Sequence, residues 1–140
     1  MEPRNRGLHT SWKDRFAVGH PLIDAQHRAF FDSIDDVMDA LEGGASRDAV
    51  LTFYGSFLED LALHFRDEEA LLYAVGYPQA DKHAQEHSAL MNSVTAVETM
   101  LLTGDNAADL RFIIRALMSS LVEHLVSEDL RYKEWVRVRA

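Results

Sequence analysis

Cysteine is absent from the 140-residue chain. Its absence excludes disulfides, thiol catalysis, zinc fingers and cysteine-bound clusters. No apolar run reaches the roughly 18 residues that a spanning helix needs, so we expect no membrane insertion. The first residues also lack the apolar stretch of a signal peptide, and we expect a cytoplasmic protein.

Basic residues are scarce as well. Lysine and arginine total 14 against 23 aspartates and glutamates, which gives a net charge of −9. Such a surface repels phosphate backbones, so we expect no nucleic-acid partner. Apolar residues make up 47% of the chain, an ordinary share for a globular protein with a buried core.

Proline occurs at only three positions, Pro3, Pro21 and Pro78. The stretches 22–77 and 79–140 therefore contain no proline that would break a helix. This pattern favours long helices.

Glycine-containing turns at 42–45, 75–78 and 103–106 separate four segments of roughly 20 to 30 residues. The length suits one domain. We expect an N-terminal arm over residues 1–20 and a single helical domain over 21–140.

Apolar residues recur in each segment at alternating steps of three and four, which is the buried seam of helices packed nearly antiparallel. The apolar seam residues are Ile23, Phe30, Ile34, Val37 and Leu41; Val50, Tyr54, Phe57, Leu61, Leu71 and Val75; Ala80, Leu90, Val94, Val97 and Leu101; and Leu110, Ile114, Leu117 and Leu121. Short turns between long helices predict an all-α fold, an up-down-up-down antiparallel four-helix bundle with an N-terminal arm.

Local signals fit these helices. Ser46 and Asn106 are suitable N-caps, and Pro21 suits a helix start. Gly55 lies inside a helix, where it costs about 1 kcal/mol relative to alanine. A close approach of a neighbouring helix would be one reason for it.

The arm carries Trp12, Phe16 and Val18, which we expect to pack on the bundle. It also carries His9 and His20, which we interpret as ordinary polar residues.

Six seam positions hold ionisable side chains instead of apolar ones: His27, His64, Glu68, His83, His87 and His124. Burying one unpaired charge of this kind costs several kcal/mol. Six of them would exhaust a typical folding stability of about 5–15 kcal/mol. A bound metal would compensate, because coordination bonds replace the lost hydration.

The heights of these residues along the bundle agree. Counted from the shared turns, cross-turn partners match within about three residues, or roughly 5 Å. The partners are His27 with His64, Glu68 with His83, and His87 with His124. All six groups are therefore predicted to meet in one layer.

Local spacing supports the same layer. His64 with Glu68, and His83 with His87, are i,i+4 pairs that share a helix face. Either pair alone would usually be a surface pair. Their joint placement in the seam is what indicates a metal site.

The last segment leaves a choice of carboxylate open. Glu128 is i,i+4 from His124, whereas Asp129 is i,i+5 and about 140° off the same face of an ideal helix. Tyr132 and Val136 nevertheless share a shifted frame with Asp129. A π-turn absorbs one extra residue, so we predict such an irregularity between His124 and Asp129.

Several acidic residues lie near the predicted ligands in the sequence. Asp24, Glu86 and Glu123 could orient imidazoles from behind. Asp67 and Glu69 are interpreted as part of a solvated face rather than as ligands.

Five imidazoles and two carboxylates are too many ligands for one metal ion, and they suit two ions bridged by the carboxylates. Nitrogen and oxygen donors of this kind suit iron. The Glu-x-x-His motif of ferritin-like di-iron proteins does not occur in the sequence. A histidine-rich site favours reversible oxygen binding over oxidation chemistry.

The sequence resembles the hemerythrin family, especially the single-domain bacterial hemerythrins, over nearly its whole length. The matching stretches are 12–19, 23–27, 64–69, 76–78, His83-x-x-x-His87 and His124-x-x-x-x-Asp129. The family's spacing in the last helix favours Asp129 over Glu128.

The resemblance implies a non-haem di-iron centre that binds dioxygen, with an oxo or hydroxo group and two carboxylates, Glu68 and Asp129, bridging the ions. It implies that one iron is bound by His83, His87 and His124 and the other by His27 and His64. Oxygen would bind at the iron with two histidines. The implied oxygen pocket is lined by Phe30, Phe65, Leu121 and Leu125.

One position departs from the family pattern. Ser120 stands four residues before His124, where family members often carry tryptophan. The smaller side chain is expected to open the pocket and to speed autoxidation.

The sequence leaves three functions open. The first is oxygen carriage, storage or delivery without enzymatic activity. The second is an oxygen or redox sensor that acts through an unknown protein partner. The third is a di-iron enzyme that handles oxygen or nitric oxide; the inverted zinc-peptidase pattern at 83–87 is a weaker match.

Overall fold

The computed structural model describes residues 14–104 and 107–139. The expectations for His9, Trp12 and Asn106 therefore lie outside the described residues, as does the side chain of Leu110.

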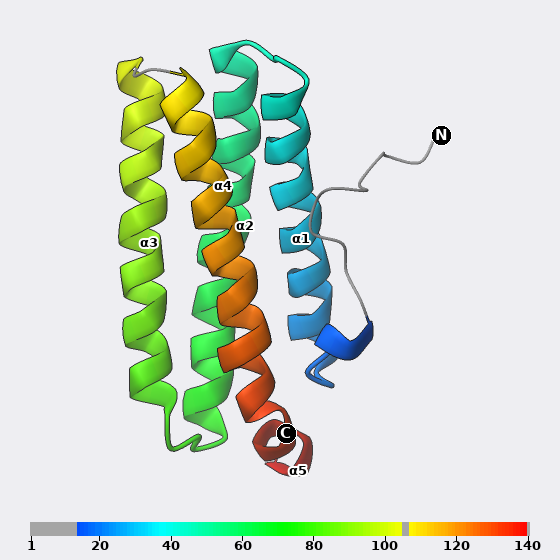
Figure 1. Cartoon of the computed structure of the whole chain (residues 1–140). Coiled ribbons are helices and arrows are strands. Elements are labelled where there is room, and N and C mark those ends of the chain that lie inside the picture. Colours follow the sequence, from blue (N-terminus) through cyan, green and yellow to red (C-terminus); the bar gives the residue numbers. More distant parts are fainter. Residues whose placement is uncertain (1–13, 105–106, 140) are drawn as a thin grey trace.

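Four long helices run alternately up and down the molecule (Figure 1). They are α1 (Pro21–Glu42), α2 (Arg47–Ala74), α3 (Ala80–Thr103) and α4 (Ala107–His124). A short 3₁₀ helix, η1 (Asp14–Phe16), precedes α1, and the chain continues after α4 as η2 (Leu125–Asp129), η3 (Leu130–Tyr132) and α5 (Lys133–Arg139). The predicted four-helix bundle is confirmed.

The helix starts follow the sequence signals. The Ser46 hydroxyl accepts a hydrogen bond from the Ala49 amide at 3.2 Å, which confirms it as the N-cap of α2. His20 is the N-cap of α1, and its Nδ1 accepts from the Ile23 amide at 3.4 Å. His20 therefore has a specific role, since it begins the helix whose first turn contains Pro21.

The described part of the arm packs on α1. The Phe16 ring stacks on Phe31 with ring centres 5.6 Å apart, and Val18 is fully buried. The Val18 amide donates to Asp24 at 2.7 Å. The expected packing of Phe16 and Val18 is confirmed.

Buried apolar residues form two clusters at different heights of the bundle. The larger one spans most of the length and includes Phe31, Ile34 and Tyr54. The smaller one lies at the end that carries α5 and includes Ile23 and Leu72. In α2 the seam prediction is off by one residue here, because Leu72 is buried and Leu71 only partly so. On α1 and α3, the predicted ligands lie between residues of the two clusters.

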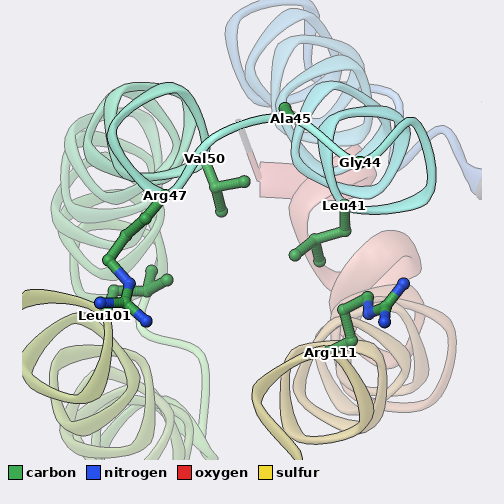
Figure 2. A pocket seen from close by; sticks show the side chains of 7 residues that line it. All are labelled: Leu41, Gly44, Ala45, Arg47, Val50, Leu101 and Arg111. Atoms are coloured by element: carbon green, nitrogen blue, oxygen red, sulfur yellow. The ribbon is translucent and has the colours of Figure 1, made fainter. Parts of the chain in front are cut away.

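The opposite end of the bundle has a hollow of about 280 Å³ next to the α1–α2 turn (Figure 2). Leu41, Val50 and Leu101 form its apolar wall, and Arg47 and Arg111 stand beside it. Leu41 is about 20 Å along α1 from His27, so this hollow is separate from the ligand layer.

Among the described residues, no helix is both long enough and apolar enough to cross a membrane.

The close approach considered for Gly55 is wrong, because a Cβ added there would have no atom of a neighbouring helix within 4 Å. Gly55→Ala should therefore raise the free energy of unfolding by up to about 1 kcal/mol, since alanine is the better helix former and nothing obstructs it. Urea denaturation measures the change. Gly104→Ala should instead lower the free energy of unfolding. Gly104 has φ +82°, and its added Cβ would collide with the Arg47 side chain. A Gly55→Ala protein less stable than the parent would contradict the prediction.

Candidate metal centre

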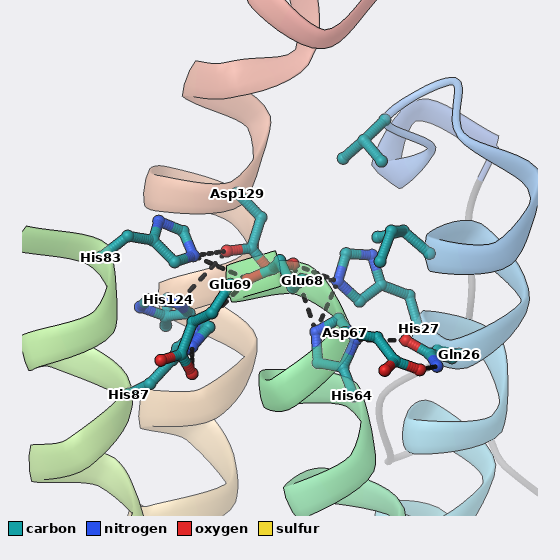
Figure 3. A network of polar contacts seen from close by, with 12 residues as sticks. Gln26, His27, His64, Asp67, Glu68, Glu69, His83, His87, His124 and Asp129 are labelled. Atoms are coloured by element: carbon teal, nitrogen blue, oxygen red, sulfur yellow. Dashed lines mark hydrogen bonds and ion pairs between the residues drawn. The ribbon is translucent and has the colours of Figure 1, made fainter. Parts of the chain in front are cut away.

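The seven predicted ligands meet in one buried layer of the bundle (Figure 3). Helix α1 supplies one, α2 and α3 supply two each, and α4 with the following turn supplies two. They are His27, His64, Glu68, His83, His87, His124 and Asp129. Their side chains are at most 9% exposed.

Asp129 reaches this layer through the predicted irregularity. Residues 125–129 form a π-turn, in which the Leu130 amide bonds to the carbonyl of Leu125. The extra residue rotates Asp129 onto the buried face, where it is 1% exposed. Glu128 is half-buried outside the ligand groups and lies 3.7 Å from Arg131. The predicted π-turn is confirmed.

The ligand atoms fall into two overlapping groups, each within 4.8 Å. One group, here called the three-histidine position, contains His83, His87 and His124. The other, the two-histidine position, contains His27 and His64. Both groups include the same two carboxylates, those of Glu68 and Asp129.

The distances suit metal coordination. Every imidazole has its Nε2 2.7–3.3 Å from an oxygen of Glu68 or Asp129. Ligands about 2.1 Å from one ion at right angles are about 3 Å apart.

Hydrogen bonding alone does not account for these contacts. Nε2 of His87, Nε2 of His124 and Oδ1 of Asp129 are buried without a hydrogen-bond partner despite their close neighbours. Nε2 of His27 lies 3.0 Å from Nε2 of His64. Such crowding of buried donor atoms is costly unless an ion lies between them. The residues present therefore fit a pair of metal ions.

Protons partly balance the metal-free centre. Burial lowers the pKa of His27, but contacts with Asp129 and Glu68 outweigh it and raise the pKa to about 9. The same balance raises the pKa of His83 to about 10. Burial would raise the pKa of both carboxyls, but the surrounding imidazoles hold it below the ordinary value. Two imidazolium groups thus offset two carboxylates at neutral pH.

Outer partners hold three of the imidazoles by their Nδ1 atoms. His64 Nδ1 lies 3.2 Å from the amide oxygen of Gln26, and Gln26 donates to Asp67 at 2.7 Å. His87 Nδ1 lies 2.9 Å from Glu69.

Glu86 approaches His124 Nδ1 at 3.6 Å, as the sequence suggested. The interpretation of Glu69 as solvated face is wrong, because its side chain is only 29% exposed and turns toward an imidazole. Asp67 likewise supports the site through an amide.

Two other suggested supports do not contact the imidazoles. Asp24 instead accepts hydrogen bonds from the arm at Val18 and Gly19, and Glu123 is exposed. Sequence reasoning missed Tyr132 as a site residue. Its buried hydroxyl donates to Glu68 at 2.8 Å, and burial holds the pKa of the phenol well above its usual range. The frame it shares with Asp129 was the available signal.

Apolar side chains border the layer. Phe30 and Phe65 have ring centres 6.3 and 5.8 Å from that of His64. Phe65 also stacks on His87 at 3.7 Å. Leu121 and Leu125 belong to the same buried cluster as both phenylalanines. These are the four residues expected around oxygen.

A four-helix bundle whose core holds a histidine-rich ligand layer defines a class of metal-binding protein. Residues 18–136 match the family model described as the hemerythrin HHE cation binding domain. The chain belongs to the hemerythrin family.

The chain is similar to curated relatives over most of both lengths. A bacteriohemerythrin from Clostridium acetobutylicum is 23% identical over 124 residues, covering 86% of this chain and 96% of the relative. Hemerythrin subunit alpha from Lingula reevii is 27% identical over 123 residues, covering 88% and 92%.

A crystal structure of a hemerythrin point mutant superposes with a TM-score of 0.80 at 21% identity, over 91% of this chain and 96% of that one. This likeness supports the fold.

The raised pKa values of His27 and His83 predict a pH-dependent stability of the metal-free protein. A histidine whose pKa is raised on folding stabilises the folded state. Its full contribution is present below the pKa of the unfolded state, about 6.5, and is lost as pH rises through the pKa of the folded state. The Tm of the metal-free protein should therefore fall between pH 7 and pH 10. Thermal unfolding followed by circular dichroism measures it, with the metal-loaded protein as control because its imidazoles are already neutral. A Tm that is constant or rises over this range in the metal-free protein would contradict the prediction.

Proposed function

We propose that this chain binds dioxygen reversibly at a pair of iron ions, as an oxygen carrier, store or delivery protein without enzymatic activity. One iron is held at the three-histidine position and the other at the two-histidine position. Glu68 and Asp129, which belong to both groups of ligand atoms, would hold the two ions together. When bound, the iron pair supplies the electrons and the open coordination position that oxygen binding needs.

The observation that carries the proposal is the composition of the buried layer. Five of its seven donors are imidazoles, which bind metal as neutral ligands, and the two carboxylates are shared by both groups. Imidazoles neutralise less of the iron charge than carboxylates would, which disfavours the high oxidation states of oxidation catalysts. The names of the relatives, bacteriohemerythrin and hemerythrin subunit alpha, support the same reading.

The surrounding side chains suit a binding role. Phe30, Phe65, Leu121 and Leu125 would form a dry pocket beside the two-histidine position. Excluding water and protons from bound oxygen slows loss of the reduced state. The Tyr132 hydroxyl, by donating to Glu68, orients the bridging carboxylate.

The function is tested by loading the protein with ferrous iron without oxygen and titrating oxygen while recording the absorption spectrum. Two irons per chain and a charge-transfer band that bleaches on deoxygenation are expected. His64→Ala or Asp129→Ala should lose half or all of the iron, because each removes a ligand. Irreversible oxidation of the parent, or full loading of both variants, would contradict the proposal.

Ser120 gives a second prediction. Its exposed hydroxyl donates to the carbonyl of Ala116, and the residue borders a hollow of about 310 Å³ that reaches His124. Ser120→Trp should cover this hollow and slow autoxidation and azide binding. Stopped-flow absorption measures both rates, and Ser120→Ala is the control that removes the hydroxyl without adding bulk. Equal rates in the parent and Ser120→Trp would remove the idea.

A further inference from the structure

The two metal positions differ in what stands behind their imidazoles. At the three-histidine position, His87 Nδ1 faces the carboxylate of Glu69 at 2.9 Å. His124 Nδ1 faces the carboxylate of Glu86 at 3.6 Å. At the two-histidine position, the partner of His64 Nδ1 is an amide oxygen. Two imidazoles of the first position thus have a carboxylate behind them, whereas His64 at the second position has a neutral acceptor.

The anionic supports are partly withdrawn from water. The side chains of Glu69 and Glu86 are 29% and 30% exposed, and Oε2 of Glu86 is buried without a hydrogen-bond partner. The other oxygen of Glu86 lies 4.0 Å from Lys82, which shares part of its charge. Lower exposure strengthens their electrostatic effect on the imidazoles. An imidazole that donates its N–H to a carboxylate, as His87 is placed to do toward Glu69, is a more basic ligand, and losing such a partner typically costs about 10–100-fold in metal affinity. Glu86, at 3.6 Å, acts on His124 through its charge alone.

The amide at the other position is itself held in place. Gln26 donates its NH₂ group to Asp67 at 2.7 Å, so its oxygen is left to face His64. The Asp67 charge is also shared with Arg66, whose Nε donates to it at 3.2 Å. The negative charge therefore stands one residue further from the imidazole and is partly neutralised.

We propose that Glu69 and Glu86 are positioning residues that make the three-histidine position the tighter one, so that it fills first and empties last. The two-histidine position, where Gln26 supports His64, binds its metal ion less tightly because the imidazole there is a less basic ligand. This inference rests on the proposed pair of metal ions, and it goes beyond ligand number because it assigns the difference to residues that do not touch the metal.

The test titrates the full-length metal-free protein with Co²⁺ in the absence of oxygen. Cobalt absorption gives the stepwise affinities, and paramagnetically shifted imidazole N–H signals in the NMR spectrum count the histidines bound. The parent should show three imidazole signals after the first equivalent and five after the second. Glu69→Gln, which keeps the shape and removes the charge, should weaken the first step about 10–100-fold and change the second by less than about twofold.

Two further variants separate this effect from general damage. Glu123→Gln removes an exposed negative charge beside His124 without an imidazole contact, and it should change neither step. The double change Gln26→Glu with Asp67→Asn moves the carboxylate next to His64 and keeps net charge and an amide-to-carboxylate bond. It should strengthen the second step, a gain that misfolding cannot produce.

The inference is overturned if Glu69→Gln affects the first step no more than Glu123→Gln does, if it weakens both steps equally, or if two imidazole signals appear first. Equal steps in the parent would also contradict it and would leave oxygen binding untouched. A chain that loads in the expected order but fails to bind oxygen reversibly would contradict the proposed function alone.

Discussion

Seven ionisable side chains buried in one layer of a small helical bundle are the constraint on which the structure depends. Each would cost several kcal/mol if buried without compensation, and a domain of this size has only about 5–15 kcal/mol of stability. Protons on two imidazoles offset the carboxylate charges, but they leave nitrogen and oxygen atoms packed at about 3 Å without hydrogen bonds. Metal coordination would satisfy all seven at once.

The rest of the fold keeps this layer in place. One apolar cluster fills most of the bundle on one side of the layer, and a smaller cluster that includes Val136 of α5 and Tyr132 closes the other end. The main departure from regular helix, the π-turn at 125–129, occurs where the chain must deliver Asp129. The irregularity turns Asp129 into the ligand layer and also places Tyr132 and Val136 in the buried cluster that follows it.

Much of this was predictable from the sequence, because helical periodicity and turn positions fix both the face and the height of a residue. The seam placed His27 beside His64 and brought Glu68 level with His83. The mismatch of His124 and Asp129 predicted the π-turn. The choice of Asp129 over Glu128 needed the family spacing as well, because helical geometry alone favoured the wrong carboxylate.

The outer shell was less predictable, because it depends on the reach of long side chains from the edges of helix faces. Glu69 follows a ligand by one residue, about 100° around the helix, so its position alone suggests that its side chain faces solvent. Gln26 acts on His64 only because another helix holds its amide. Gly55 illustrates the same limit, since spacing shows that a glycine is present but not whether any neighbour approaches it.

The central claim is that two metal ions lie in this layer and share two carboxylates. Diffraction from crystals of the iron-loaded protein, measured on both sides of the iron absorption edge, tests it most directly. Two anomalous peaks should appear between Glu68 and Asp129, one against three imidazoles and the other against two. A single peak, or iron bound only outside this layer, would contradict it.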